Sequence, residues 1–108
     1  MNTAGMPDLR PEHRAIVDAI LRAHLPRGAS VWAFGSRVTG RARPYSDLDL
    51  AIDAGRRLDL GELAEFSDAF SNSDLPWKVD VIDWHAANPG FRAAIAADLV
   101  PWEADATG

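Results

Sequence analysis

Residues 34–50 constrain this chain more than any other stretch, because they place a tight turn and two carboxylates between two strands. The Gly35-Ser36 step follows an apolar run, and Asp47-Leu48-Asp49 opens the next one. Side chains alternate across a strand, so Asp47 and Asp49 point to one face with Cα atoms about 6.5 Å apart. Two carboxylates aimed together repel, which makes a purely structural role unfavourable. A divalent cation between them would convert this repulsion into a binding site.

The pattern of apolar residues around this stretch predicts an α+β (α/β) protein, a small mixed sheet with helices packed on one side. With 108 residues the chain is expected to be one domain over residues 1–108, with an ordered core at about 9–103. A capping box is expected at Asp59 and Glu62. Helices are expected from Pro11 to His24, from Leu60 to Ser71 and from Pro89 to Leu99, and one helical turn is expected over Ser36 to Gly40. Strands are expected at Ser30 to Phe34, Asp47 to Asp53 and Trp77 to Ile82, and an edge strand is expected at Val100 to Trp102.

Charge and composition narrow the classes of partner and compartment. Eleven basic and 16 acidic residues give a net charge of −5, which argues against direct binding to long nucleic acids because these need a basic footprint. The sequence contains no cysteine, so it has neither disulfides nor thiolate metal ligands. No apolar run approaches the roughly 20 residues of a membrane helix, and residues 1–10 lack the apolar core of a signal peptide. We therefore expect a cytoplasmic protein without membrane contact.

The Gly-Ser turn and the aspartate pair together suggest a site for a nucleoside triphosphate. Glycine lets the backbone approach a ligand closely, and Ser36 offers its hydroxyl and N–H at the start of a helical turn, where phosphate binding is favoured. Ten residues later, Asp47 and Asp49 can hold a divalent metal. Other classes fail: an EF-hand loop would need different residues at Ala51 and Ile52, and the sequence has no Gly-Lys-Ser/Thr of a P-loop.

A third carboxylate from another strand would complete a two-metal site, and Asp80 is the better candidate than Asp83. If Asp80 faces the site, Val79 and Val81 remain available for the core. If Asp83 faces it, both valines join the polar face and Asp80 turns inward, which costs more.

With Gly35-Ser36, ten intervening residues, Asp47-Leu48-Asp49 and the third aspartate in place, the chain resembles the polymerase-β-type nucleotidyltransferase superfamily over about residues 11–103. The short length, the run 78–83 and the following helix with Phe91 resemble its minimal members, the MNT family. The Gly-Ser and Asp-x-Asp part of this resemblance is specific, whereas the third aspartate is identified only by its context.

The resemblance implies an antitoxin that transfers AMP from ATP onto a tyrosine hydroxyl of a partner HEPN-domain RNase toxin. It implies that Asp47, Asp49 and Asp80 are catalytic and bind Mg²⁺, as two ions, and that Gly35 and Ser36 hold the β- and γ-phosphates. Two alternatives stay open: a non-catalytic antitoxin that inhibits the toxin by binding, or nucleotidyl transfer to a small molecule or an RNA end. The nucleotide-binding candidates are Gly35, Ser36, Arg37 and Ser46.

Several side chains near the motif have two interpretations. Arg37, Arg41 and Arg43 could reach a triphosphate or an acidic partner, or only keep the loop soluble. The four tryptophans are expected to pack, although one of them could stack on adenine. Asp53 shares a face with Asp47 and Asp49, but is expected to be a surface residue at the strand end.

Overall fold

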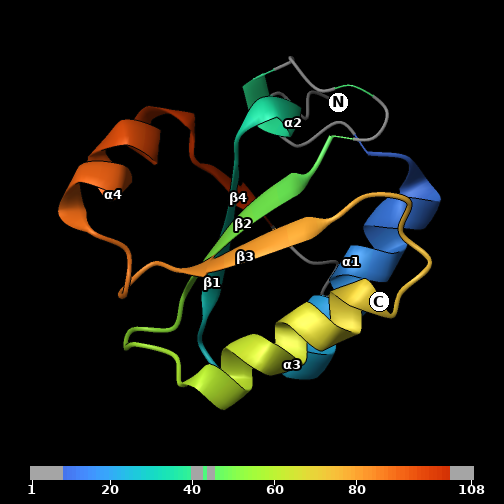
Figure 1. Ribbon diagram of the computed structural model, residues 1–108, viewed down its shortest axis with the longest axis horizontal. Helices are drawn as coiled ribbons and strands as arrows, with labels where there is room; N and C mark the ends of the chain where they lie inside the picture. Colours follow the sequence, from blue (N-terminus) through green and yellow to red (C-terminus); the bar gives the residue numbers. More distant parts are fainter. Residues whose placement is uncertain (1–8, 40–42, 44–45, 103–108) are drawn as a thin grey trace.

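The computed structural model of the protein describes residues 9–39, 43 and 46–102 and contains a four-stranded mixed sheet in the order β3-β2-β1-β4 (Figure 1). Strand β1 pairs antiparallel with both β2 and β4, whereas β2 and β3 run parallel. The expected mixed sheet is therefore confirmed. In chain order the elements are α1 (Pro11–His24), β1 (Ser30–Phe34), α2 (Ser36–Thr39), β2 (Leu48–Asp53), α3 (Leu60–Ser71), β3 (Val79–Asp83), α4 (Pro89–Ile95), the 3₁₀ turn η1 (Ala96–Asp98) and β4 (Val100–Trp102).

Helices α1 and α3 pack together on one face of the sheet, and the core lies between them and the strands (Figure 1). The alternating residues Leu48, Leu50 and Ile52 of β2 are fully buried there against Leu21 and Phe66. Burial of apolar surface stabilises a fold by about 25 cal/mol per Å², so this layer favours folding.

Helix α4 lies on the opposite side of the sheet from α1 and α3 (Figure 1), so the expectation that the helices pack on one side is correct for α1 and α3 and wrong for α4. Its Phe91 meets Phe34 edge to face, with ring centroids 6.0 Å apart. Phe34 follows Ala33, which belongs to the core, so alternation along β1 turns Phe34 to the other face. That second apolar patch gives α4 a surface to cover.

Local sequence signals account for most element boundaries. The Asp59 side chain accepts a hydrogen bond from the Glu62 N–H at 2.8 Å, and Glu62 returns one from the Asp59 N–H at 2.9 Å, so the expected capping box starts α3. Helix α4 ends at Ile95, earlier than expected, because the chain must turn before Val100 pairs with Ala33. Strand β3 begins at Val79, two residues later than expected.

Within the described ranges, no helix combines the length and the apolar character that crossing a membrane requires.

Candidate active site

A row of three side chains crosses the sheet on the face opposite α1 and α3. Phe34 of β1 is aligned with Asp49 of β2, and Asp49 is aligned with Asp80 of β3. Because β2 and β3 are parallel neighbours, aligned residues carry their side chains to the same face of the sheet. Asp47 is exposed and directly precedes β2. The topology thus brings Asp47, Asp49 and Asp80 to one end of the sheet, next to the Gly35-Ser36 turn.

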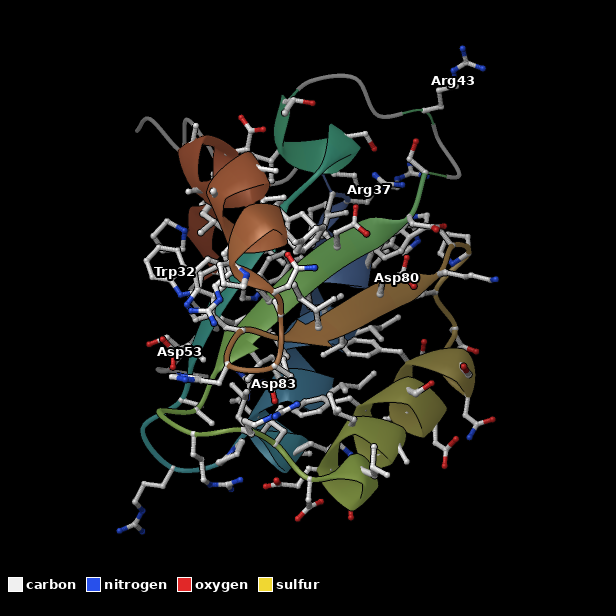
Figure 2. All side chains as sticks on the ribbon, turned by 60° about the vertical axis from the view of Figure 1, so that its left-hand side comes forward. Trp32, Arg37, Arg43, Asp53, Asp80 and Asp83 are labelled. Atoms are coloured by element: carbon white, nitrogen blue, oxygen red, sulfur yellow. The ribbon has the colours of Figure 1, made fainter. Side chains whose placement is uncertain are left out.

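Asp83 is held away from this row. It lies on the same face of β3 as Val79 and Val81 and is only 5% exposed. Its carboxylate accepts hydrogen bonds from the backbone N–H of Leu58 at 2.7 Å and of His85 at 3.1 Å. These bonds anchor the segment before α3 and the turn after β3, so Asp83 has a structural task. The strand register therefore places Asp80, and not Asp83, beside Asp49. Asp80 and Asp83 lie apart, toward opposite ends of β3 (Figure 2).

Gly35 is the point where the turn and the carboxylates meet. Its φ is +84°, in the region that glycine adopts without strain. A Cβ at this position would collide with Oδ2 of Asp49 and would lie 3.2 Å from its Cγ. The absence of a side chain therefore leaves the space that the Asp49 carboxylate occupies. After Gly35 the backbone closes one turn of α2, with the Val38 and Thr39 N–H groups donating to the Gly35 carbonyl at 3.0 and 3.2 Å.

The electrostatics of Asp49 reflect its surroundings. Burial, followed by the neighbouring charges of Asp80 and Asp47, raises the pKa of the Asp49 carboxyl from 3.8 to about 6. The ionised carboxylates of Asp47, Asp49 and Asp80, without a cation between them, therefore repel one another at neutral pH. In the described part of the chain, no three acidic or histidine side chains converge closely enough to hold an ion as they stand. The carboxylate oxygens of Asp47, Asp49 and Asp80 nevertheless fit the ligand preference of Mg²⁺.

Arg37, a candidate for nucleotide binding, is only 7% exposed and connects three parts of the site. Its Nε donates a 2.9 Å hydrogen bond to the carbonyl of Ser46. Its guanidinium carbon lies 4.6 Å from the centroid of the Trp77 ring, within the range of a cation–π contact. Arg37 thus ties α2 to the residue before Asp47 and to the segment before β3.

The other loop residues differ in how they are placed. Arg43 is exposed and extends away from the body of the protein (Figure 2), while its N–H donates to the Ser46 hydroxyl at 2.7 Å. Gly40 and Arg41 lie outside the described residues. Trp77 and Trp102 are buried, in agreement with the packing interpretation, whereas Trp32 and Trp84 are half-buried.

Asp53 lies far along β2 from Asp49, toward the other end of the strands (Figure 2). Its carboxylate accepts a hydrogen bond from the Gly55 N–H at 2.9 Å and lies 2.7 Å from Nε2 of His85. These two bonds, in that order, lower the pKa of the Asp53 carboxyl. Asp53 is thus a strand-end residue with local partners, as expected from the sequence.

A cavity of about 740 Å³ adjoins the carboxylates, and sequence reasoning did not predict it. Asp47 and Asp80 line it together with residues of α3 and of the connection from α3 to β3. One sequence signal points to it, since Leu75, Pro76 and Trp77 form an apolar run within that connection. The run alone does not reveal that it lies beside the aspartates.

Comparison with known proteins agrees with this geometry. The family described as "Polymerase beta, Nucleotidyltransferase" matches residues 18–100. The chain therefore belongs to the polymerase-β nucleotidyltransferase family. The chain is 46% identical to the probable protein adenylyltransferase MntA of Haemophilus influenzae over 95 residues, which cover 88% of this chain and 82% of that protein.

Solved structures share the fold at lower sequence identity. A toxin–antitoxin structure with AMP-PNP matches with a TM-score of 0.70 and 24% identity, over 85% of this chain and 74% of the matched chain. A tri-AMPylated HEPN toxin of Shewanella oneidensis in complex with its MNT antitoxin matches with a TM-score of 0.64 and 23% identity, over 87% of this chain and 72% of the matched chain. At this identity the likeness supports the fold alone.

Proposed function

We propose that this protein is an antitoxin adenylyltransferase, which transfers AMP from ATP to a tyrosine hydroxyl of a partner HEPN-domain RNase toxin and so neutralises it. The observation that carries the proposal is the alignment of Asp49 with Asp80 across β2 and β3, with Gly35 making room for the Asp49 carboxylate. The 46% identity to a probable protein adenylyltransferase supports a protein as the acceptor.

In this proposal Asp47, Asp49 and Asp80 would hold two Mg²⁺ ions, which supply charge stabilisation at the reacting phosphate. Gly35 and Ser36 would hold the β- and γ-phosphates at the turn that starts α2. Asp80, on the outer strand, would take up the proton of the attacking hydroxyl. A bond then forms between the tyrosine oxygen and the α-phosphorus, and the bond from that phosphorus to the bridging oxygen breaks to release pyrophosphate.

We assign Arg37 and Ser46 to the same nucleotide site, as residues that hold the phosphate-binding turn and the aspartate segment together. The hydrogen bond from Arg37 to the Ser46 carbonyl supports this role. Both ATP and a toxin that cleaves RNA are found in the cytoplasm, so we place the protein there. Its net charge of −5 argues against a nucleic acid as its macromolecular target, in agreement with a protein partner.

The test is the intact mass of the partner toxin after incubation with this protein, ATP and Mg²⁺. The wild-type protein should add AMP in whole increments, which binding alone cannot produce. Asp47→Asn combined with Asp49→Asn should abolish the increment, because the site loses two of its three charges. The matched control is Asp53→Asn on the same face of β2, which should transfer like the wild type.

Two results would contradict the proposal. Unchanged transfer by the double variant would eliminate the carboxylate site. A wild-type protein that adds no AMP but still silences the toxin would favour inhibition by binding alone.

A further inference from the structure

We propose that Trp77 is a positioning residue of the nucleotide site, which acts through Arg37 to fix the distance between the phosphate-binding turn and the aspartate segment. This inference rests on the proposed function and adds a residue that lies outside the Gly-Ser and Asp-x-Asp motif. Trp77 belongs to the connection from α3 to β3 and is only 8% exposed.

The two parts of the proposed nucleotide site belong to different segments of the chain. Gly35 and Ser36 stand at the start of α2, whereas Asp47 directly precedes β2. Their separation matters, because a misplacement of about 1 Å can lower the rate of a positioned reaction about 100-fold. Helix α2 has only four residues, and so short a helix is not stable by itself. A tertiary contact must therefore hold α2 against the segment that leads into β2.

Arg37 makes that contact, and its buried guanidinium needs partners to stay in place. Its Nε donates a hydrogen bond of 2.9 Å to the Ser46 carbonyl, and only 7% of the residue is exposed. Burying a charged group is unfavourable unless neighbouring groups compensate for the lost water. The Trp77 ring, whose centroid lies 4.6 Å from the guanidinium carbon, supplies part of this compensation as a cation–π contact. The ring therefore favours a position of Arg37 from which its Nε reaches the Ser46 carbonyl.

Trp77 is itself held on two sides. The carbonyl of the next residue, Lys78, accepts a hydrogen bond of 2.9 Å from the N–H of Leu48, the first residue of β2. The His13 ring of α1 meets the Trp77 ring edge to face, with centroids 5.7 Å apart and planes at 84°. Trp77 thus has a fixed position relative to β2 and to α1, and its contact with Arg37 fixes α2 relative to both.

Two other arginine–tryptophan contacts in the described part of the chain show what is specific to Trp77. Arg14 lies 4.5 Å from the centroid of the Trp102 ring, and Arg92 lies 5.6 Å from that of Trp84. Neither contact includes a residue of α2 or of the segment before β2, where the proposed nucleotide residues lie. The nucleotide site should therefore depend on the ring of Trp77 and not on the other two rings.

The experiment compares two substitutions of Trp77 in the full chain. Trp77→Leu removes the ring and keeps an apolar side chain, whereas Trp77→Phe keeps an aromatic face for Arg37. Calorimetric titration with Mg²⁺ and ATP measures the Kd for the nucleotide, and the intact mass of the toxin measures transfer. Trp77→Leu should raise the Kd about 5- to 30-fold, the range that a desolvated cation–π contact implies, and Trp77→Phe should recover most of this loss. Trp77→Met is a second variant without a ring, in case Trp77→Leu does not fold.

A double-mutant cycle tests whether Trp77 acts through Arg37. In the Arg37→Ala background, Trp77→Leu should change the Kd for ATP by less than about twofold, because the ring no longer has a guanidinium to hold. Trp84→Leu is the matched control, since it makes the same substitution at a ring that contacts Arg92 instead. Its Kd for ATP should equal that of the wild type.

The outcomes separate this role from the proposed function. A Kd for ATP in Trp77→Leu equal to that of the wild type would overturn the positioning role. An equal loss of affinity in Trp84→Leu would overturn it too, as would a loss that Trp77→Leu still shows in full in the Arg37→Ala background. A wild type that binds ATP but adds no AMP to the toxin would refute the proposed function, and the same titrations would still decide the role of Trp77.

Discussion

At the scale of single residues, Gly35 offers a test of why the turn and the carboxylate must lie so close. An alanine at this position would have a strained backbone, because its φ would be +84°. Its Cβ would also collide with the Asp49 carboxylate. Gly35→Ala should lower the free energy of unfolding by about 1–2 kcal/mol from the backbone alone, with a further loss from the collision. AMP transfer should fall at least tenfold, because Asp49 must move.

The control for this prediction is Gly55→Ala. Gly55 has a similar φ of +76°, but a Cβ there would meet nothing within 4 Å. In urea denaturation, Gly55→Ala should show the loss of unfolding free energy that comes from the backbone alone. Its AMP transfer should equal that of the wild type. Equal loss of transfer in both variants would mean that the contact with Asp49 is irrelevant to activity.

Ionised Asp49 should lower the stability of the fold, although the proposed function requires this carboxylate. Its pKa in the folded protein is about 6, above the ordinary value of 3.8, so its ionisation opposes folding. As far as Asp49 alone is concerned, the fold is not destabilised below pH 3.8, and the destabilisation grows as the pH rises from 3.8 through 6. Without Mg²⁺, Asp49→Asn should therefore be more stable than the wild type at pH 7.5, by on the order of 1 kcal/mol for this partly exposed group. The advantage should vanish near pH 3.5.

Asp53 provides the opposite sign on the same face of the same strand. Its pKa is lowered by the Gly55 N–H and by His85, so its ionised form stabilises the fold above the ordinary aspartate pKa. Asp53→Asn should be less stable than the wild type at pH 7.5, and the difference should shrink as the pH falls. Chemical denaturation at several pH values measures both variants. Parallel curves for Asp49→Asn and Asp53→Asn would refute the assignment of opposite shifts.

At the scale of elements, the four-residue helix α2 depends on Arg37 for its position relative to β2. Arg37→Ala removes the hydrogen bond to the Ser46 carbonyl and the contact with Trp77, at a cost of about 1–3 kcal/mol. Because Ser46 directly precedes Asp47, the KM for ATP should rise as well. Arg37→Lys keeps a charge but lacks the Nε donor, so it should recover only part of both losses.

Arg43→Ala is the matched control, since Arg43 is exposed and interacts with Ser46 through its backbone N–H. Thermal melts and ATP titrations of the three variants separate the roles. A lower Tm with an unchanged KM in Arg37→Ala would limit Arg37 to a purely structural function.

The elements also show how far sequence reasoning reaches. The β1 boundaries, the α3 capping box and the placement of Asp80 rather than Asp83 beside Asp49 follow from local rules, because capping and alternation need only a few neighbouring residues. The position of α4 does not follow in this way. The sequence places Phe91 on this helix, but only the three-dimensional structure reveals that Phe91 packs against Phe34 of β1.

The cavity beside Asp80 escapes sequence reasoning for the same reason. Its walls come from α3, from the connection after it and from the start of β3, and their separation in space depends on the packing of all three. The burial of Arg37 is likewise a tertiary property, since Trp77 is 40 positions away in the chain.

At the scale of the whole molecule, a buried contact joins α1 to β4 near the two ends of the described chain. Trp102 donates its indole N–H to Oδ1 of Asp18 at 2.8 Å, and both residues are 5% exposed. Arg14 lies over the Trp102 ring, 4.5 Å from its centroid. The contact spans 84 positions and fastens the edge of the sheet farthest from β3.

Trp102→Phe should lower the free energy of unfolding by about 1–3 kcal/mol, because the buried Asp18 carboxylate loses a hydrogen-bond donor. Asp18→Leu combined with Trp102→Phe should cost less than the sum of the two single changes, since neither polar partner is then left alone. Urea denaturation of the four proteins gives this coupling energy. AMP transfer measured well below Tm should stay at the wild-type level in all of them, because two strands, β2 and β1, separate β4 from the strand that carries Asp80. A loss of transfer in the folded double variant would show that the far edge of the sheet also positions Asp49 and Asp80.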